Sequence, residues 1–364
     1  MLKIKNCGLM EFSEKNEDNN VFCFGAGKNF QKFNTVYNGV WGIVDNYRSG
    51  ESIRLDNGKQ IRIVSLREFV SSYKKNKKIV LVITCSAYDE IINQLDEIKE
   101  LDGMMCYLDL FLMMFTDHYK QYPISLATED KIPKKIHYCW FGRGQIPAEY
   151  SKYMESWRKY CPDYEIVRWD ETNYDVDKNE YLREMYKNKQ WAFVSDYARI
   201  DILYKYGGIY LDTDVELLRG LDEFLKWDMF CGFEDNQYVA WGLGVGAVAG
   251  HKILKNVLEA YEHIPIYKDN ATLNLINCPI IQTAVIKQYG FEINGTPQLI
   301  NNVAVYPKEF FAPFSYINGF GNTTSNTYSI HHYSANWMDE ETRNGLKKLE
   351  AFSKRIYERT ESEL

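Results

Sequence analysis

GGIYLDTDVELL, residues 207–218, combines the features that decide the fold. A pair of glycines ends a predicted helix, a short apolar strand follows, and Asp212 and Asp214 stand at the end of that strand. Alternate residues of an extended segment face the same way, so the two carboxylates project together. Ligand sites of α/β sheets gather at the carboxyl ends of strands. The stretch therefore predicts an α/β fold with an acidic site at a strand end.

Asp212 and Asp214 form a candidate metal site. Two carboxylates about 7 Å apart at the backbone can converge on one hard divalent cation. Carboxylate oxygens suit Mn²⁺ or Mg²⁺ better than a soft metal. An isolated pair of this kind is often a solvated turn. The apolar strand, the glycine pair and the helix in front of it favour the metal.

The helix predicted over residues 192–206 carries a second pair of charged side chains. Asp196 and Arg199 are neighbours at i and i+3 near its start. On a surface helix they would form an ordinary ion pair, but apolar residues flank them on most sides. A buried Asp and Arg need polar partners, and a sugar hydroxyl or a phosphate would serve.

Charge and composition narrow the classes of function. The 364 residues include 43 Lys and Arg against 50 Asp and Glu, a net charge of −7. This balance argues against broad nucleic-acid binding and against electrostatic capture by an anionic membrane. The aromatic content of 15% suits the binding of sugars or bases, with compositional bias as the alternative explanation.

The sequence also bears on location. We find no secretory signal, and the longest apolar run, near residues 103–115, is too short to cross a bilayer. The eight cysteines are scattered and form no CxxC pair, as expected for reduced thiols. We expect a cytoplasmic protein, with peripheral contact at the inner face of the membrane or with polysaccharide-assembly machinery as a further expectation.

The chain is predicted to hold two α/β units and a helical tail. In residues 1–125, short apolar runs alternate with helical patterns, which predicts a smaller Rossmann-like domain of unknown role. A polar linker leads into the second unit, residues 131–338. Residues 339–364 carry one apolar stripe and predict an amphipathic helix packed on its own domain. A membrane or partner surface is the alternative for that stripe.

The first unit contains a glycine turn, FGAGKNF at residues 24–30. Gly25 and Gly27 match the first two glycines of a dinucleotide-binding fingerprint, and Phe30 departs from the third. Asp45, at the end of the next predicted strand, stands where an acid could meet a ribose. The alternative is a structural turn between strand and helix, which uses the same glycines.

Three motifs in order resemble a known family. IHYCWFG at 136–142, SDYARIDILYKYGGIYLDTD at 195–214 and SIHHYSANW at 329–337 are similar to the glycosyltransferases with the DXD sugar-binding region. That family includes bacterial capsule-synthesis enzymes and yeast initiating mannosyltransferases, and the clostridial glucosylating toxins are more distant. The resemblance covers residues 132–337. It implies a GT-A fold, a nucleotide-sugar donor, Mn²⁺ or Mg²⁺, and retention of anomeric configuration.

The resemblance also implies roles for residues that would bind the donor. Trp140 matches the tryptophan that stacks on the base, with core packing as the alternative, and His137 and Gly142 line the same strand end. Trp337 matches a tryptophan of the C-terminal segment, for which the alternative is a buried strand end.

Catalytic and metal roles follow in the same way. Asp196 and Arg199 match the pair that holds the donor sugar and steadies the diphosphate. Asp212 matches the first aspartate of DXD, toward the ribose and metal, and Asp214 matches the direct metal ligand.

A late histidine is expected to complete the metal site. The resemblance points to His332, with His331 as the alternative because the register of the two is open. Tyr333 replaces the tryptophan more usual after the histidine pair, and residues 334–336 depart from the usual AGS. These departures bear on the third metal contact and on the closing loop.

Candidates for the acceptor site follow the predicted strand after DXD. Glu234, Asp235 and Trp241 could bind a sugar acceptor, and the indole of Trp241 could stack on a ring. A flexible loop beside a glycine-rich strand is the alternative.

Together these features predict a metal-dependent retaining hexosyltransferase. It would use a nucleotide-diphosphate sugar, UDP rather than GDP, and a glycan or lipid-linked acceptor in bacterial surface or capsule polysaccharide synthesis. No carboxylate is identifiable as a covalent nucleophile, so front-face attack by the acceptor hydroxyl is expected. One alternative is a haloacid-dehalogenase-like phosphatase using DTDVEL, residues 212–217. The other is a non-catalytic sugar-nucleotide sensor or scaffold.

Overall fold

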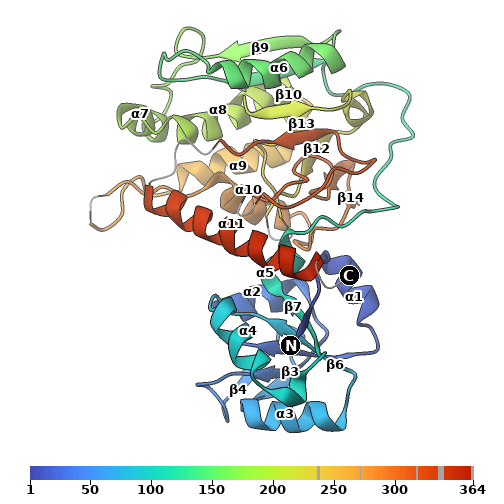
Figure 1. Cartoon of the computed structure of the whole chain (residues 1–364). Helices are drawn as coiled ribbons and strands as arrows, with labels where there is room; N and C mark the ends of the chain where they lie inside the picture. The colour runs from blue at the N-terminus through green and yellow to red at the C-terminus, as the bar shows by residue number, and fades with distance from the viewer. Residues whose placement is uncertain (236–237, 271, 317–318, 335–339, 362–364) are drawn as a thin grey trace. The chain divides into compact units, whose positions relative to one another are not determined.

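The computed structural model describes residues 1–235, 238–270, 272–316, 319–334 and 340–361 (Figure 1). The chain forms two compact units. Unit 1 comprises Met1–Asp117, Ile317–Gly321 and Leu346–Leu364, and unit 2 comprises His118–Tyr316 and Asn322–Gly345. The predicted division at 1–125, 131–338 and 339–364 treats each unit as one continuous segment, whereas here the chain returns to unit 1 twice.

Unit 1 is built on a seven-stranded sheet in the order β1-β7-β6-β2-β3-β5-β4. Its strands are β1 (Lys3–Ile4), β2 (Asn20–Phe24), β3 (Val40–Val44), β4 (Ser52–Arg54), β5 (Gln60–Val64), β6 (Ile79–Ile83) and β7 (Met105–Leu108). All neighbours are parallel except β4, which pairs antiparallel with β5. From the central β2 the chain first adds β3 to β5 on one side and then β6 and β7 on the other. This is the order of a Rossmann-like sheet, as the sequence predicted.

Helices cover both faces of this sheet. They are α1 (Leu9–Lys15), α2 (Lys28–Val36), α3 (Leu66–Lys75), α4 (Tyr88–Asp96) and α5 (Asp109–Met114), with a 3₁₀ turn at Lys99–Leu101. One apolar core joins α3 and α4 to the sheet, and a second joins α1, α2 and α5 to the opposite face. Because β6 is buried at every position, its unbroken apolar run serves both cores.

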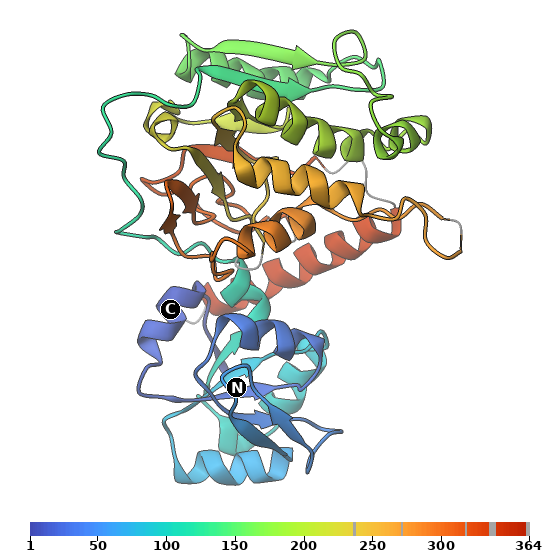
Figure 2. The same ribbon diagram turned by 180° about the vertical axis from the view of Figure 1, so that it is seen from behind.

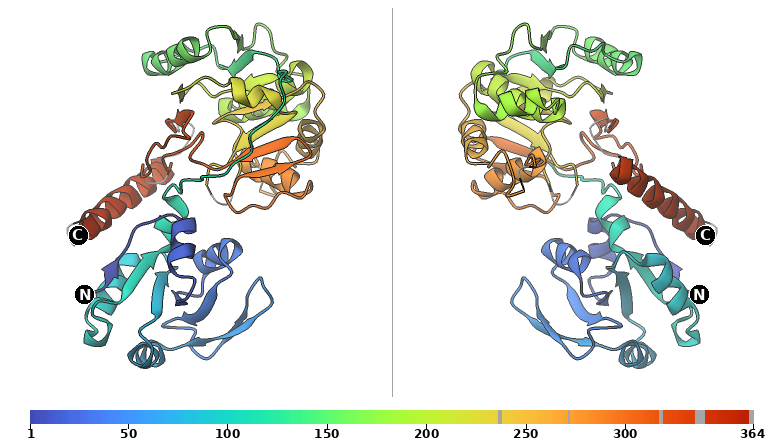
Figure 3. Two further views of the ribbon diagram at one scale, coloured as in Figure 1. Left: turned by 90° about the vertical axis from the view of Figure 1, so that its right-hand side faces the viewer. Right: turned by 90° about the vertical axis from the view of Figure 1, so that its left-hand side faces the viewer.

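The C-terminal helix α11 (Glu340–Glu361) is one continuous helix (Figure 3). Its apolar stripe packs within unit 1 from Leu346 onward. The ring of Phe352 stacks on Tyr88 with centroids 5.3 Å apart, and Ile356 is 4% exposed in the core that contains α3 and α4. Arg355 forms an ion pair with Asp89 beside them. The last segment of the chain therefore completes the core of the first unit.

Replacing Ile356 with alanine is expected to lower the free energy of unfolding of unit 1 by about 2–5 kcal/mol, because it leaves a cavity in this core. Hydrogen exchange measured by mass spectrometry should show faster exchange in β6 and β7. The control Lys354→Ala changes an exposed side chain of the same helix and should shift stability by less than about 0.5 kcal/mol. Faster exchange confined to unit 2 would contradict this assignment of α11.

Unit 2 is built on a second seven-stranded sheet, in the order β14-β15-β12-β13-β10-β8-β9. Its strands are β8 (Lys135–Cys139), β9 (Glu165–Trp169), β10 (Gly208–Tyr210), β12 (Met229–Gly232), β13 (Val245–Ala247), β14 (Gln298–Ile300) and β15 (Val303–Tyr306). The strands β13 and β14 run against the other five. A separate antiparallel pair joins β11 (Val215–Leu217) to β16 (Ser329–His331). The predicted class, an α/β protein in which a second, mixed-sheet unit follows a smaller Rossmann-like unit, is confirmed.

The helices of unit 2 divide between the two faces of its sheet. They are α6 (Ala148–Tyr160), α7 (Glu180–Lys187), α8 (Trp191–Tyr206), α9 (Lys252–Glu262) and α10 (Cys278–Lys287), with a 3₁₀ helix at Asp222–Lys226. One core contains residues of α7 to α10, and the other contains residues of α6 and the 3₁₀ helix. Figure 2 shows α8, α9 and α10 side by side. No helix in the described parts of the chain is long and apolar enough to cross a membrane.

The glycine pair between α8 and β10 is required by the backbone. Gly207 has φ 64° and Gly208 has φ 107°, values that side chains with a Cβ rarely adopt. A Cβ at Gly208 would also lie 2.9 Å from Nε2 of His137. The pair therefore lets the long buried helix turn directly into the strand that carries the aspartates.

Candidate active site

Several strand ends of unit 2 meet at one edge of the sheet. The strands β8, β10 and β12 run in the same direction, so the residues after each of them emerge together. These residues are 140–142, 211–214 and 233–235. The chain also enters β13 from this edge, through the glycine-rich residues 242–244, because β13 runs the opposite way. This edge is therefore where the sequence predicted the site.

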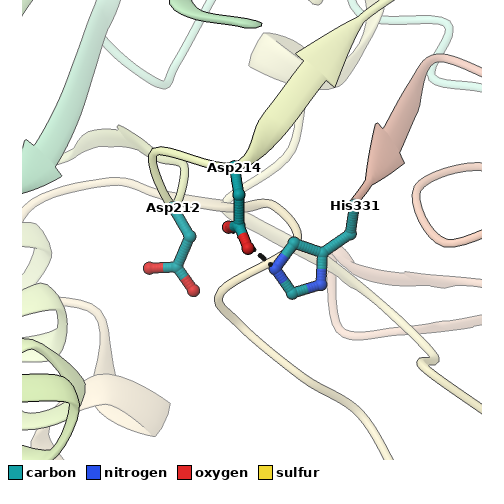
Figure 4. A group of neighbouring side chains, drawn as sticks. All are labelled: Asp212, Asp214 and His331. Carbon is teal, nitrogen blue, oxygen red and sulfur yellow. Dashed lines mark hydrogen bonds and ion pairs between the residues drawn. The ribbon is translucent and has the colours of Figure 1, made fainter. Parts of the chain in front are cut away.

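Asp212, Asp214 and His331 converge at this edge (Figure 4). One potential ligand atom from each lies within 4.8 Å of the others. The pairing of β11 with β16 places Val215 opposite His331, which brings Nε2 of His331 to 3.1 Å from Oδ1 of Asp214. The backbone N–H of Ser334 donates to the other oxygen of Asp214 at 2.9 Å.

Asp214 and His331 shift each other's pKa values. Burial alone would raise the pKa of Asp214, but the charge and hydrogen bond of His331 and the Ser334 amide hold it below its usual value. Burial alone would lower the pKa of His331, and Asp214 raises it instead. The two side chains thus stabilise each other's charged forms.

The three side chains suit a hard divalent cation. Two carboxylates and one imidazole nitrogen are ligands that Mn²⁺ accepts, and Mg²⁺ shares the preference for oxygen. An imidazole must be neutral to bind a metal, so an ion would replace the hydrogen bond between His331 and Asp214. The residues therefore fit the predicted metal.

Arg199 lies beside this trio, nearly buried. It is 4% exposed, and its Nη2 lies 2.8 and 3.1 Å from the two oxygens of Asp212. Its Nη1 lies 3.1 Å from Oδ1 of Asp196. Burial raises the pKa of Asp196, and the charge of Arg199 opposes that rise. The pair that the sequence placed on one helix face is thus brought to the aspartates of DXD.

One donor of Arg199 is left open. Its Nε is buried and has no hydrogen-bond partner among the described residues. A buried guanidinium N–H without a partner costs free energy, so this position favours a ligand oxygen such as that of a phosphate or a sugar hydroxyl.

Asp212 is held by residues that sequence reasoning missed. The hydroxyl of Tyr210 donates to Oδ1 at 3.0 Å, and the backbone N–H of Asp212 donates to the carbonyl of Gly242 at 2.9 Å. A Cβ at Gly242 would lie 2.1 Å from Oδ2 of Asp212. Gly242 is therefore required for close approach, and the glycine-rich run before β13 was its only signal in the sequence.

The structure separates the two adjacent histidines. Nε2 of His332 lies 2.9 Å from Oε2 of Glu216, and its ring stacks on Tyr153 with centroids 3.9 Å apart. Adjacent residues of an extended segment face opposite ways, so only one histidine can face Asp214. The geometry places His331 there, which corrects the prediction of His332 and agrees with the alternative.

Of the predicted donor-binding residues at the end of β8, His137 is turned inward. It is 1% exposed, its Nε2 lies 2.9 Å from the Gly207 carbonyl, and Trp169 Nε1 donates to its Nδ1 at 3.1 Å. Burial lowers the pKa of His137 to about 4. Both ring nitrogens have partners within the fold, so the prediction that His137 contacts the donor is corrected to support of the glycine pair.

Trp140 and Gly142 lie at the site edge. The indole N–H of Trp140 donates to the Gly144 carbonyl at 2.8 Å, and its ring, half-buried, packs edge-on against Tyr150. Gly142 has φ 93°, and a Cβ there would lie 2.8 Å from the ring of Trp191. The stacking of Trp140 on a base stays a prediction. Trp337 lies outside the described residues.

Two of the three acceptor candidates lie at the sheet edge where β8, β10 and β12 end. Glu234 and Asp235 follow β12 after one intervening residue, Phe233, and are partly buried. Burial, with a smaller contribution from the charge of Asp235, raises the pKa of Glu234 to about 7. Trp241 is 0% exposed and belongs to the core with α7 to α10, so the prediction that it stacks on an acceptor ring is corrected.

In unit 1, Asp45 stabilises the glycine turn at residues 24–30. Its carboxylate accepts from the backbone N–H of Ala26 at 2.9 Å and from those of Tyr47 and Arg48 at 2.9 and 3.1 Å. Gly25 has φ 105°, and Gly27 is the N-cap of α2. The geometry supports the structural alternative, because the acid expected to meet a ribose is engaged within the fold.

Comparison with known proteins supports the resemblance. Residues 147–230 match the family model described as the glycosyltransferase sugar-binding region containing the DXD motif. Inositol phosphoceramide mannosyltransferase 3 of Schizosaccharomyces pombe is 37% identical over 100 residues, covering 26% of this chain and 28% of the relative. Mannosyl phosphorylinositol ceramide synthase SUR1 of Saccharomyces cerevisiae is 26% identical over 250 residues, covering 61% and 64%.

The chain thus covers 28% of the length of the first relative and 64% of the length of the second. Among solved structures, PaToxG glycosyltransferase aligns with 18% identity and a TM-score of 0.35, over 46% of this chain and 71% of that one. The resemblance seen in the sequence is confirmed, and residues 147–230 of the second unit match the sugar-binding region of the DXD glycosyltransferases.

Proposed function

We propose that the protein is a metal-dependent glycosyltransferase that moves a hexose from a nucleoside-diphosphate sugar to a hydroxyl of a glycan or lipid-linked acceptor. One observation carries the proposal. The trio Asp212, Asp214 and His331 lies beside the buried Arg199, whose Nε–H group has no hydrogen-bond partner among the described residues. A cation-binding site next to the fixed positive charge of Arg199 suits a diphosphate.

Asp212, Asp214 and His331 would hold the metal, and Arg199 would bind the donor. A bound Mn²⁺ or Mg²⁺ supplies positive charge that screens a diphosphate and stabilises its departure. Arg199 is preorganised by Asp196 and Asp212, so it can direct Nε at a donor oxygen without reorganising. A chain of net charge −7 needs such local positive groups to bind a polyanion.

The names of the two fungal relatives, a mannosyltransferase and a mannosyl phosphorylinositol ceramide synthase, favour mannose as the sugar. GDP-mannose is therefore the first donor to test, beside the UDP-hexoses that we expected from the sequence. Retention of configuration, a role in surface or capsule polysaccharide synthesis, and a cytoplasmic place at the inner face of the membrane belong to the same proposal. The lipid-linked acceptor is supported by relatives whose names include ceramide.

The phosphatase alternative has less support. It requires the first aspartate of DTDVEL to attack phosphorus as a free nucleophile. Here both oxygens of Asp212 face Nη2 of Arg199, and Tyr210 donates to one of them. Such a carboxylate is neutralised and held rather than exposed for attack.

A donor-turnover assay tests the proposed function. The protein is incubated with GDP-mannose, UDP-glucose or UDP-galactose, with Mn²⁺ or with EDTA, and free nucleoside diphosphate is measured. We expect release from at least one donor that depends on the metal. Release of phosphate from phosphomonoesters would favour the phosphatase, and nucleotide binding without turnover would favour the sensor.

A further inference from the structure

Polar side chains of α10 contact two parts of the candidate active site. Cys278 is the first residue of this helix, and Gln282 and Thr283 follow one turn later. The three are 8%, 0% and 6% exposed, whereas the other buried residues of the helix are apolar. Buried polar side chains cost free energy unless they are paired, so the partners of these three show what the helix does. No role for this helix was predicted from the sequence.

Cys278 contacts the guanidinium of Arg199. Nη1 of Arg199 lies 3.5 Å from the sulfur of Cys278 and 3.1 Å from Oδ1 of Asp196. Burial, and after it the charge of Asp196, raise the pKa of the Cys278 thiol well above its usual value. The thiol therefore stays protonated, so its sulfur can accept from Arg199 while its S–H donates to Asp196. One side chain thus joins both members of the charged pair.

This environment excludes a nucleophilic role for Cys278. A cysteine at the start of a helix is often reactive, because the positive end of the helix dipole favours the thiolate. Here the pKa of the thiol is raised instead, and the side chain is almost fully buried. Its contribution is therefore a hydrogen-bonding one.

Gln282 holds the loop behind Asp212. Its Oε1 accepts from the backbone N–H of Trp241 at 3.1 Å. The next residue, Gly242, provides the carbonyl that accepts from the N–H of Asp212 at 2.9 Å. A Cβ at Gly242 would lie 3.4 Å from Nη1 of Arg199, so this loop also borders the guanidinium. Gln282 therefore fixes the backbone against which the first aspartate of DXD is held.

The helix itself is held in place at its start. Pro279, at its second position, restricts the backbone where α10 begins. The hydroxyl of Thr283 accepts from the N–H of Val239 at 3.1 Å, two residues before the bond that Gln282 makes. Cys278 and Gln282 are four residues apart, a spacing that places them on one face of the helix. This face can therefore act on Arg199 and on Asp212 together.

We propose that Cys278 and Gln282 are positioning residues that hold Arg199 and Asp212 in the geometry needed to bind the donor. The effect on turnover rests on the proposed function, because it takes Arg199 as the group that binds the diphosphate. Nη1 is engaged by Asp196 and Cys278, and Nη2 is engaged by Asp212. Nε is then the N–H of Arg199 that remains for a ligand, and a guanidinium held at both ends presents it without reorganising.

Steady-state turnover tests the consequence for the reaction. Cys278→Ala and Gln282→Met remove the hydrogen-bonding atoms and keep an apolar side chain. Each should lower kcat/KM by about tenfold, because a small displacement of a charged group weakens the transition state more than the fold. Cys278→Ser keeps a group that accepts from Arg199 and donates to Asp196, so it should recover to within about threefold of wild type.

Thr283→Val is the matched control. It changes the same helix and removes a bond to the same loop, but that bond ends at Val239 and not beside Arg199 or Asp212. Its kcat/KM should stay within about threefold of wild type, since one neutral hydrogen bond away from the site contributes little. Thermal unfolding of all four variants shows how far each one loosens the fold.

A second measurement follows Arg199 directly and does not depend on turnover. In protein labelled with ¹⁵N-arginine, NMR records the guanidinium N–H signals of Arg199, which are assigned with Arg199→Lys. We expect slow exchange of these protons with water in the wild type and exchange about tenfold faster in Cys278→Ala, because one partner is lost. Cys278→Ser and Thr283→Val should resemble the wild type.

Three results would overturn the inference. The first is an equal loss of turnover in Cys278→Ala, Cys278→Ser and Thr283→Val, which indicates general loosening of α10. The second is turnover at the wild-type level in both Cys278→Ala and Gln282→Met, and the third is unchanged Arg199 signals in Cys278→Ala. Failure of the proposed function looks different, because the wild type would then release no nucleoside diphosphate while the Arg199 signals still respond to Cys278→Ala.

Discussion

Asp214→Asn is expected to lower the kcat/KM of metal-dependent donor turnover by about 10³-fold, which corresponds to roughly 4 kcal/mol of transition-state stabilisation. Asparagine removes the charge that the cation needs but keeps an oxygen that can accept from the Ser334 amide, which Asp214 binds at 2.9 Å. The fold should therefore persist while the metal is lost. Turnover measured over a range of Mn²⁺ concentrations should show a metal requirement that rises steeply in the variant.

A matched variant separates metal binding from the loss of any acidic group. Glu216→Gln neutralises a carboxylate two residues further along, which contacts His332 and not the trio. It should keep turnover within about threefold of wild type, because surface charges of this kind contribute little. An Asp214→Asn protein that keeps wild-type turnover and an unchanged Mn²⁺ requirement would show that the trio is not the metal site.

Most of the features of the site that could be predicted come from local patterns in the sequence. The helix before DXD was expected at 192–206 and lies at Trp191–Tyr206, because its apolar positions and the glycine pair that ends it are neighbours in sequence. The pairing of Asp196 with Arg199, which the structure forms at 3.1 Å, followed from their i, i+3 spacing in the same helix. These features depend on chain geometry over fewer than about ten residues, for which periodicity is a reliable guide.

Features set by distant partners could not be predicted in this way. His331 faces Asp214 because β16 pairs with β11, about 115 residues earlier, and the sequence does not reveal that register. Trp241 is buried because α7 to α10 cover it, although its glycine-rich surroundings suggested an exposed loop. The partner of α11 was equally hidden, since the buried residues of the core that Ile356 enters otherwise lie between Leu2 and Phe111.

The second large effect is expected from Arg199→Ala, which should lower the free energy of unfolding of unit 2 by about 3–5 kcal/mol and abolish turnover. The change removes the guanidinium that contacts both Asp196 and Asp212 and leaves two partly or fully buried carboxylates without it. The control Arg168→Ala breaks a more exposed ion pair with Asp170 and should cost no more than about 1 kcal/mol. Arg199→Lys should recover part of the stability, but one ammonium cannot serve both carboxylates and a ligand, so turnover should stay low.

The dependence of this loss on pH identifies its cause. Burial already raises the pKa of Asp196, and Arg199 is the charge that opposes the rise, so removing Arg199 raises that pKa further. A group whose pKa is higher in the folded state than in the unfolded state destabilises the fold as the pH rises through the folded value. The variant should therefore lose more stability relative to wild type at pH 8 than at pH 5. Urea unfolding at the two pH values measures the difference, and an equal loss at both would mean that packing of the arginine stem, rather than its charge, stabilises this part of the site.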